Sequence, residues 1–269
     1  MDSQVWGEIE SESDTEFSED YGMMEEVPEN SEDRTINPID CYRHFITDEI
    51  ISLMVRETNR YAEQHVQRQK LTKRSKTLQW KPSTSEEMLK FLGIIIEMGL
   101  VQMPEIAYYW SKSKLFRSEA IQNMMSRDRF ELLLKFLHFS NNQEEHADQD
   151  RLFKLRPLLD FLRARFKSIY VPGSVISIDE TMVPWKGRLL FKQYIPGKAH
   201  KYGVKIYKMV ATNGYTWNFM VYTGKQDPTA GLGHAQTVVL DLADGLLECH
   251  RTVILDNFFT SMALAKSLL

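Results

Sequence analysis

Cysteine and long apolar runs are scarce in this sequence of 269 residues. Its two cysteines, Cys41 and Cys249, are too few for a disulfide framework or a cysteine-rich zinc module, which favours a reducing compartment. The most apolar stretch, residues 88–101, contains Lys90 and Glu97 and falls short of the ~20 residues that a membrane-spanning helix needs. The N-terminus is acidic, whereas a secretory signal peptide begins with basic residues. The sequence therefore predicts an intracellular, soluble protein with no membrane partner.

Lys and Arg are absent from residues 1–33, which contain 13 acidic residues. The remainder holds 24 acids and 33 bases, so an acidic tail precedes a basic body. A basic body indicates a polyanionic partner, with the tail as spacer, decoy or protein-docking segment; a merely soluble surface is the alternative. Residues 1–36 have few large apolar side chains and cannot offset the entropy of ordering, so we predict a disordered acidic tail.

Apolar residues repeat at helical spacing across residues 37–172. Residues 39–68 favour helices, and Ser83 or Thr84 can cap a further helix that reaches Leu100. Residues 127–139 and the segment after Pro157 keep the same period. This region is therefore predicted to be a mainly helical domain.

The period changes after Pro172 and Gly173. Residues 175–178, 204–211 and 217–223 read as strands, and Asn213-Gly214 predicts a hairpin between the last two. A helix over 236–247, a strand over 252–255 and a helix over 261–269 follow. Residues 173–269 thus predict an α/β layer arrangement, and the whole chain an α+β organisation.

Asp179 and Asp256 each follow a short apolar run that reads as a buried strand. Two acids held at one rim of a sheet repel each other by roughly 4 kcal/mol at about 4 Å, and a bound cation reverses that cost. Carboxylate oxygens are the ligands that Mg²⁺ or Mn²⁺ prefers. The pair therefore predicts a divalent-metal site, with structural capping by each aspartate as the alternative.

Acidic residues are also absent from residues 181–226, where eight bases lie. A run of bases directly after a candidate metal ligand predicts contact with a phosphate backbone. Aromatic residues are interleaved with them and could stack on extruded bases or pack in the core. The predicted DNA-binding residues of this run are Lys186, Arg188, Lys192, Lys198, His200, Lys201 and Lys205.

Several ordered motifs in these segments resemble one family. Residues 178–180, 185–188, 194–198 and 201–206 resemble the opening of the catalytic core of piggyBac transposases, and residues 256–261 resemble their second acidic motif. In the helical region, residues 91–93, 98–101, 109–110, 129–130 and 137–141 are similar to the segment that precedes that core. The resemblance covers about residues 38–269.

The resemblance implies a ribonuclease H-like DDE/D core that cuts and joins double-stranded DNA at transposon ends and TTAA targets with Mg²⁺. It implies that Asp179 and Asp256 are the first two catalytic, metal-binding acids, and that the helical region serves DNA binding and homodimerisation. Glu180 alternates with Asp179 on a strand, so we expect it to face the other way and do not count it as a metal ligand. The family's third aspartate would lie past Leu269, which predicts a truncated core with slow or absent cleavage.

Two other functions remain open on the sequence. The chain could be a DNA-binding or dimerisation module without catalysis, or it could bind proteins through its acidic tail. A basic cluster within residues 70–81 could be a solvated loop, a DNA contact or part of a nuclear import signal. With the transposase resemblance, the predicted location is the nucleus.

Overall fold

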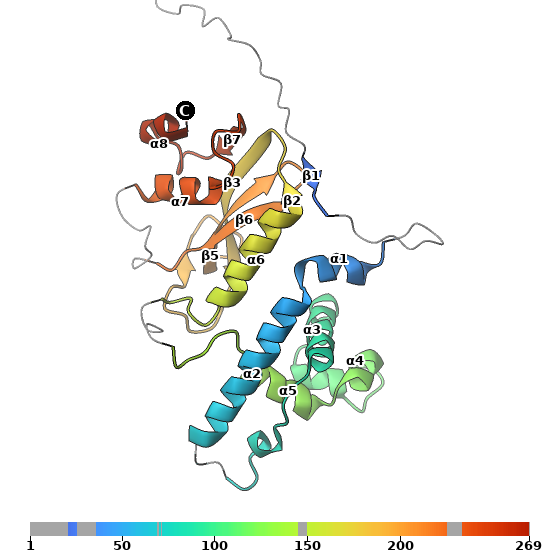
Figure 1. Ribbon diagram of the computed structural model, residues 1–269. Helices are drawn as coiled ribbons and strands as arrows, with labels where there is room; N and C mark the ends of the chain where they lie inside the picture. Colours follow the sequence, from blue (N-terminus) through green and yellow to red (C-terminus); the bar gives the residue numbers. More distant parts are fainter. Residues whose placement is uncertain are drawn as a thin grey trace, which may run out of the picture. The chain divides into compact units, whose positions relative to one another are not determined.

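The computed structural model describes residues 21–25, 36–68, 70, 72–144, 150–224 and 233–268. The chain forms two compact units (Figure 1). The helical unit comprises residues 27–165, and the sheet unit comprises residues 1–26 and 166–269. The predicted domain boundaries at residues 36 and 172 stay predictions.

In the part of the chain that the structure describes, the helical unit consists of five helices, two 3₁₀ turns and the start of a sixth helix. Residues 145–149 lie outside that part. The elements are α1 (Pro38–Phe45), α2 (Asp48–Arg68), η1 (Lys76–Gln79), α3 (Ser85–Leu100), η2 (Ile106–Trp110), α4 (Glu119–Met124), α5 (Arg127–Phe136) and the first part of α6 (Arg156–Ile169).

The helix starts of this unit follow from its capping residues. Thr84, one of the two predicted caps of α3, accepts a hydrogen bond from the Glu87 backbone N–H, and Ser126 caps α5 in the same way. The buried face of α3, with Met88, Phe91 and Ile94, packs with residues of α2 and α5 into one core. The helix predicted to reach Leu100 and the helix predicted over residues 127–139 are therefore confirmed, although α5 ends earlier, at Phe136. The helix α4 was not predicted.

Glu87 connects α3 to α5 through a two-fold hydrogen-bonded ion pair with Arg129, with N···O distances of 2.7 and 2.6 Å. The Arg129 guanidinium also lies 4.6 Å from the centre of the Trp80 ring. Because both charged side chains are mostly buried, Glu87→Gln should lower the free energy of unfolding by about 1–3 kcal/mol in urea titrations. The neighbouring Glu86→Gln, whose pair with Lys90 is exposed, should leave it nearly unchanged; equal losses would contradict this account.

In its described part, the sheet unit has a main sheet of five strands, which is mixed. Among the described residues its strands are β3 (Val175–Pro184), β4 (Gln193–Tyr194), β5 (Tyr202–Ala211), β6 (Thr216–Val221) and β7 (Thr252–Leu255). The order is β4-β5-β3-β7, and β6 also pairs with β5. β3 is antiparallel to β5 and parallel to β7. The helices α7 (His234–Ala243) and α8 (Met262–Leu268) complete the predicted α/β arrangement.

The core of this unit lies between the sheet and α7 (Figure 1). Val238, Val239 and Leu242 of α7 are fully buried together with Ile178 and Met209 of the sheet. Asn218 on β6 also faces α7, because its side-chain amide donates to the backbone carbonyl of Leu242 at 2.9 Å. The predicted hairpin at Asn213-Gly214 is confirmed, with Gly214 at φ 88°, a conformation that glycine adopts readily.

Two features of the sheet unit correct the sequence predictions. β3 continues to Pro184, so Asp179 lies within the strand and not at its end. A short strand β1 (Gly22–Met23) pairs with β2 (Tyr170–Val171), so the prediction of disorder over 1–36 was wrong for these residues. The backbone N–H of Met24 also donates to the Ile169 carbonyl at 2.7 Å, which gives this segment of the tail a partner. Residues 1–20 and 26–35 of the predicted tail lie outside the described residues.

None of the helices in the described ranges is both long and apolar enough to cross a bilayer.

Candidate metal and nucleic-acid site

The pairing of β3 with β7 brings Asp179 and Asp256 together. Ile178 pairs with Leu255 in parallel register, and the residue that follows each of them is an aspartate. One carboxylate oxygen from each of Asp179, Glu180 and Asp256 lies within 4.8 Å of the others. We call these three residues the acid cluster. Three carboxylates at this separation offer the hard oxygen ligands that Mg²⁺ and Mn²⁺ bind, so their donor chemistry fits a divalent cation.

Glu180 belongs to this cluster, although strand alternation predicted that it would face the other way. β7 ends at Leu255, so the edge of β3 beyond Ile178 is not covered by β7. The Glu180 side chain, which is longer than that of aspartate, can turn around this uncovered edge. The prediction that Glu180 faces away from Asp179 was wrong. The alternation of residues along one strand carries no information about where the neighbouring strand ends.

Backbone N–H groups hold both aspartates. The carboxylate of Asp179 accepts from the Glu180 N–H at 2.7 Å. The carboxylate of Asp256 accepts from the N–H groups of Phe258 and Phe259 at 3.0 and 3.3 Å, in the turn that follows β7. These bonds orient the two side chains without using any other charged group.

Lys198 and Lys205 place positive charge beside the acid cluster. The Lys198 ammonium lies 3.1 Å from the Glu180 carboxylate, and this hydrogen bond raises the pKa of Lys198. Burial lowers the pKa of Lys205, while the charges of the three acids oppose that shift. The Lys205 ammonium lies 4.5 and 4.9 Å from the ring centres of Tyr207 and Phe258. A phosphate that approached these acids would therefore meet two cations.

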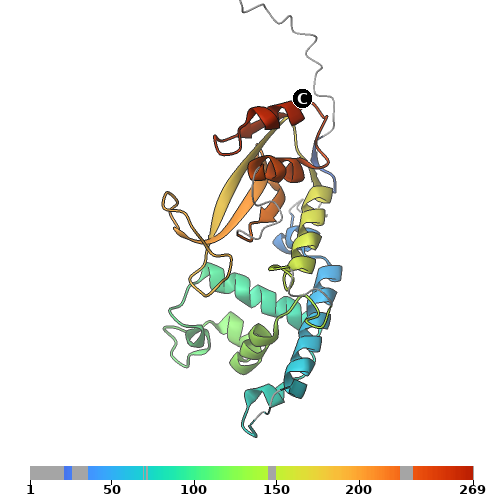
Figure 2. The ribbon, with the colours of Figure 1, turned by 90° about the vertical axis from the view of Figure 1, so that its left-hand side faces the viewer.

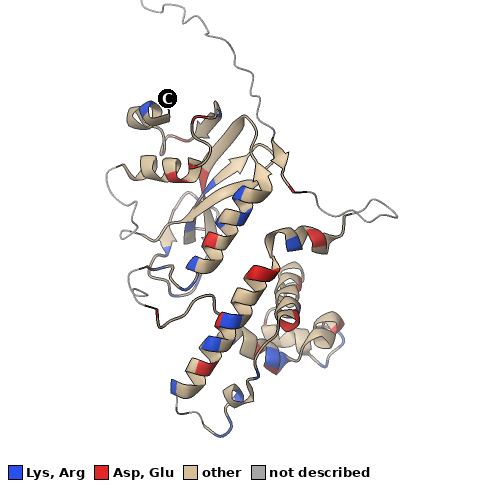
Figure 3. Cartoon of the chain, in the orientation of Figure 1, with Lys and Arg blue, Asp and Glu red and all other residues tan. Residues whose placement is uncertain are grey.

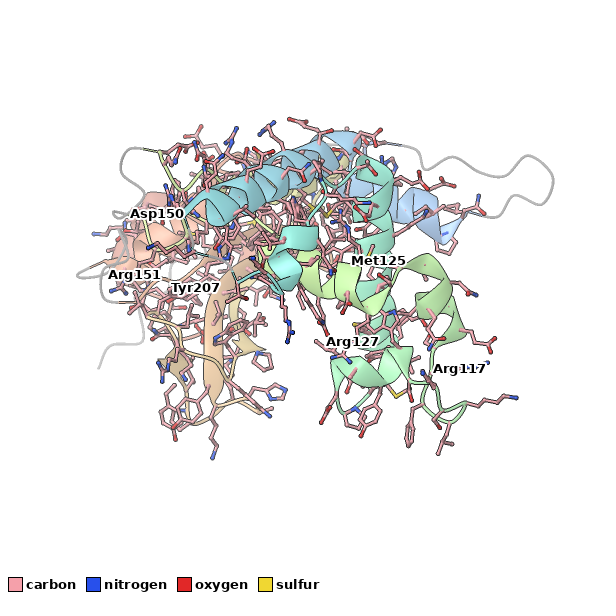
Figure 4. All side chains as sticks on the ribbon, turned by 90° about the horizontal axis from the view of Figure 1, so that it is seen from below. Arg117, Met125, Arg127, Asp150, Arg151 and Tyr207 are labelled. Atoms are coloured by element: carbon pink, nitrogen blue, oxygen red, sulfur yellow. The ribbon has the colours of Figure 1, made fainter. Side chains whose placement is uncertain are left out.

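Tyr207 on β5, labelled in Figure 4, is buried next to Lys205. Its hydroxyl lies 2.8 Å from Nε2 of His234, the first residue of α7. The Tyr207 ring also packs edge-on against the buried Phe259. Tyr207 is thus a packed residue, as aromatic residues within strands often are, and not a free stacking surface.

The other predicted DNA-binding residues lie on the loop between β3 and β5. This loop projects from the sheet (Figure 2). Lys186, Lys192, His200 and Lys201 are exposed there and surround a pocket, and Arg188 is exposed on the same loop outside that lining. The structure thus divides the predicted residues into two groups, one at the acid cluster and one around the loop pocket. Lys225, the last base of the run, lies outside the described residues.

Basic residues also lie along α6 (Figure 3). Unlike those of the loop, several of them already have protein partners. Arg156 pairs with Asp150 at 2.7 Å, and Arg165 donates to the His44 carbonyl at 2.6 Å. Lys167 donates to the backbone carbonyl of Asp244 at 3.0 Å. The exposed lysines of the β3–β5 loop are therefore better placed for an external anion.

Comparison with known proteins identifies the family. A family model described as Transposase IS4 matches residues 37–269. The human PiggyBac transposable element-derived protein 3 is 32% identical over 236 residues, which cover 86% of this chain and 38% of that protein. This chain belongs to the piggyBac-type transposase family. The resemblance inferred from the sequence motifs is confirmed.

Other members of the piggyBac family agree with the fold. The human PiggyBac transposable element-derived protein 2 is 29% identical over 249 residues, 89% of this chain and 39% of that protein. A cryo-EM structure of the piggyBac transposase synaptic complex with hairpin DNA matches with a TM-score of 0.75 and 29% identity, over 93% of this chain and 51% of that one. The chain therefore spans about two fifths of the length of these curated piggyBac relatives.

The acid cluster of this piggyBac-family chain gives a prediction about Lys198. Its ammonium neutralises part of the charge that would attract a divalent cation, so Lys198→Gln should tighten Mn²⁺ binding about three- to ten-fold in calorimetric titrations without DNA. Lys266→Gln on α8 removes the same charge from an exposed position in the same unit and should change the affinity little. Weaker binding by the Lys198 variant would show instead that Lys198 holds Glu180 in place.

Proposed function

We propose that this chain binds double-stranded DNA and carries acidic residues for metal-dependent cutting and joining of phosphodiester bonds in cut-and-paste transposition. The convergence of Asp179, Glu180 and Asp256 beside Lys198 and Lys205 is the observation that carries the proposal. Its family membership and the likeness to a piggyBac transposase in complex with hairpin DNA support it.

The residues divide the work by their chemistry. Asp179 and Asp256 would hold Mg²⁺ or Mn²⁺, and the position of Glu180 supports adding it to them. When bound, such an ion supplies charge that activates the attacking oxygen and stabilises the leaving one. Lys198 and Lys205 would neutralise the phosphate that lies next to the carboxylates. Lys186, Arg188, Lys192, His200 and Lys201 would hold the DNA backbone farther along the loop.

Transposon ends, the TTAA target, homodimerisation and nuclear location are parts of the same proposal. They are supported by the family and, for the nucleus, by exposed bases at Lys70, Lys73 and Arg74. Lys76 is also exposed, but it is already paired with Asp128 and Glu131 at 2.5 and 3.3 Å. Replacing Lys73 and Arg74 with glutamine should reduce nuclear accumulation of a fluorescent fusion; an unchanged distribution would remove the import role.

The proposal is tested by DNA binding and plasmid nicking with the same preparation. The logarithm of the affinity for duplex DNA should fall linearly with the logarithm of salt concentration, because neutralised phosphates release counterions. Supercoiled plasmid should be nicked slowly with Mn²⁺ and remain intact with Asp179→Ala. Salt-independent association would contradict DNA binding, and nicking by the Asp179 variant would contradict the metal role.

A second candidate function is DNA binding without cutting. The ion pair between Lys198 and Glu180 favours it, because the acid cluster then has an internal cation that balances part of its charge. In that case the wild-type chain would bind DNA with the expected salt dependence and would not nick it with either metal.

A further inference from the structure

The side-chain amine of Lys205 lies between two aromatic rings. Its Nζ is 4.5 Å from the ring centre of Tyr207 and 4.9 Å from that of Phe258. The residue is partly buried, and its backbone carbonyl accepts a hydrogen bond from the Tyr222 N–H at 2.9 Å. Among the residues that the structure describes, no carboxylate forms an ion pair with Lys205. The amine therefore has apolar walls and no fixed counter-ion.

These surroundings favour the neutral form of the amine. Burial lowers the pKa of Lys205, and the charge of Lys198 acts in the same direction, although Glu180, Asp256 and Asp179 oppose the shift. The hydrogen bond to Glu180, in contrast, raises the pKa of Lys198 and keeps that side chain protonated. Only a neutral amine attacks a carbonyl carbon, so Lys205 is the better nucleophile of the two.

The carboxylate of Glu180 comes from the same face of the sheet as this amine. Glu180 of β3 pairs directly with Tyr207 of β5, and Lys205 lies two residues before Tyr207, so the three side chains start on one face. Diagonal neighbours on two antiparallel strands are about 7–8 Å apart, which long side chains can span. The Glu180 side chain is only 14% exposed. An amine and a partly desolvated carboxylate are the two groups that imine formation and a following proton removal require.

We propose that Lys205 forms an imine with the aldehyde of an abasic site in DNA, and that Glu180 then promotes breakage of the strand by β-elimination. The inference rests on the proposed DNA-binding function and goes beyond it, because this reaction needs no metal ion and breaks a carbon–oxygen bond. The deoxyribose of an abasic site opens to a free aldehyde at C1′, whereas intact DNA has none. The activity is therefore selective for strands that have lost a base.

The reaction balances without any oxidant or reductant. The Lys205 amine adds to C1′, and loss of water gives the protonated imine. The Glu180 carboxylate takes a proton from C2′, and the electron pair left on C2′ expels the 3′-oxygen with its phosphate as the C3′–O bond breaks. One fragment then ends in a 5′-phosphate and the other in an unsaturated aldehyde. Water hydrolyses the imine that is still attached to this aldehyde and restores the amine.

The test uses the full chain and a duplex with one abasic site, made by enzymatic removal of a uracil, in EDTA. Cyanoborohydride reduces the imine to a stable amine, so a covalent complex should form, and peptide mass spectrometry should find the adduct on Lys205. Lys205→Arg keeps the positive charge and cannot form an imine, so at saturating protein it should give at least about ten-fold less adduct. Lys266→Gln is the control, since it removes an exposed lysine of the same unit and should leave the yield unchanged.

The role of Glu180 is tested separately from that of the amine. Without cyanoborohydride, Glu180→Gln should slow strand breakage at least about ten-fold, because an amide cannot accept the C2′ proton. With cyanoborohydride, the same variant should still form the adduct. Breakage at the wild-type rate would show that Glu180 is not the base.

The remaining outcomes separate this inference from the proposed function. A duplex with a tetrahydrofuran analogue in place of the abasic site has no aldehyde, so it should be bound and give no adduct. Binding of this duplex, with no adduct on the abasic one or with an adduct only on exposed lysines of the β3–β5 loop, overturns the lyase activity and leaves DNA binding in place. Binding of neither duplex overturns the proposed function together with the inference.

Discussion

Replacing Asp256 with asparagine is expected to weaken Mn²⁺ binding by the chain at least about 100-fold. The carboxylate lies within 4.8 Å of those of Asp179 and Glu180, so it contributes both a ligand and one of three negative charges. A single charge pair at 4 Å is worth about 4 kcal/mol at an effective dielectric near 20, and 100-fold corresponds to about 2.8 kcal/mol. Calorimetry, or the electron paramagnetic resonance signal of free Mn²⁺, measures the loss.

Asparagine is the informative replacement because it keeps the local structure. Its side-chain oxygen can still accept the hydrogen bonds that the Phe258 and Phe259 N–H groups donate to Asp256. Asp244→Asn is the control, since Asp244 is an exposed acid of the same unit whose carboxylate lies 3.7 Å from Lys167. If both variants bind Mn²⁺ like the wild type, the acid cluster is not a metal site.

The two aspartates could be paired from sequence because each follows a short apolar run, although β3 continues past Asp179 and β7 is partly exposed, not buried as predicted. Ile178 and Leu255 then pair in parallel register, which sets the next residues side by side. Glu180 could not be assigned in this way. Its position depends on where β7 ends beside β3. The alternation of residues in β3 does not show where that neighbouring strand ends. The loop pocket was visible in composition, as bases interleaved with aromatics, but the positions of its rings, Trp185 and Tyr202, depend on contacts with Gly187 and Tyr194.

Elements with strong local sequence signals were predicted correctly, whereas elements that depend on non-local pairing were not. Strong local signals, such as the Thr84 cap and the Asn213-Gly214 turn, placed α3 and the β5–β6 hairpin correctly. The second half of β3 has no apolar run, and its ten-residue length comes from pairing with β5. β1 pairs only through two residues of a highly acidic segment, and its partner strand is almost 150 residues away in the sequence. Such non-local pairing overrides the composition of a short segment.

Removal of the Phe259 ring is expected to have the largest effect on stability. Phe259 is fully buried, and its ring centre lies 5.8 Å from that of Tyr207 and 5.0 Å from that of Phe258. Phe259→Ala should lower the free energy of unfolding by about 3–5 kcal/mol, because it removes apolar contacts and leaves a cavity under the turn that positions Asp256. Urea titration measures the loss, and faster amide exchange in β3 and β7 assigns it to the sheet unit.

The adjacent Phe258 provides the matched control, because the same substitution one position earlier removes a ring that is 51% exposed. Phe258→Ala should lower the free energy of unfolding by less than about 1 kcal/mol. It should still weaken DNA binding, since the Phe258 ring lies 4.9 Å from the Lys205 ammonium and helps to position that charge. The Phe259 variant should lose Mn²⁺ affinity as well as stability, because a turn no longer anchored by the ring would shift the N–H of residue 259, which donates to Asp256. Equal destabilisation by the two variants would mean that the turn after β7 does not anchor the acid cluster to the core.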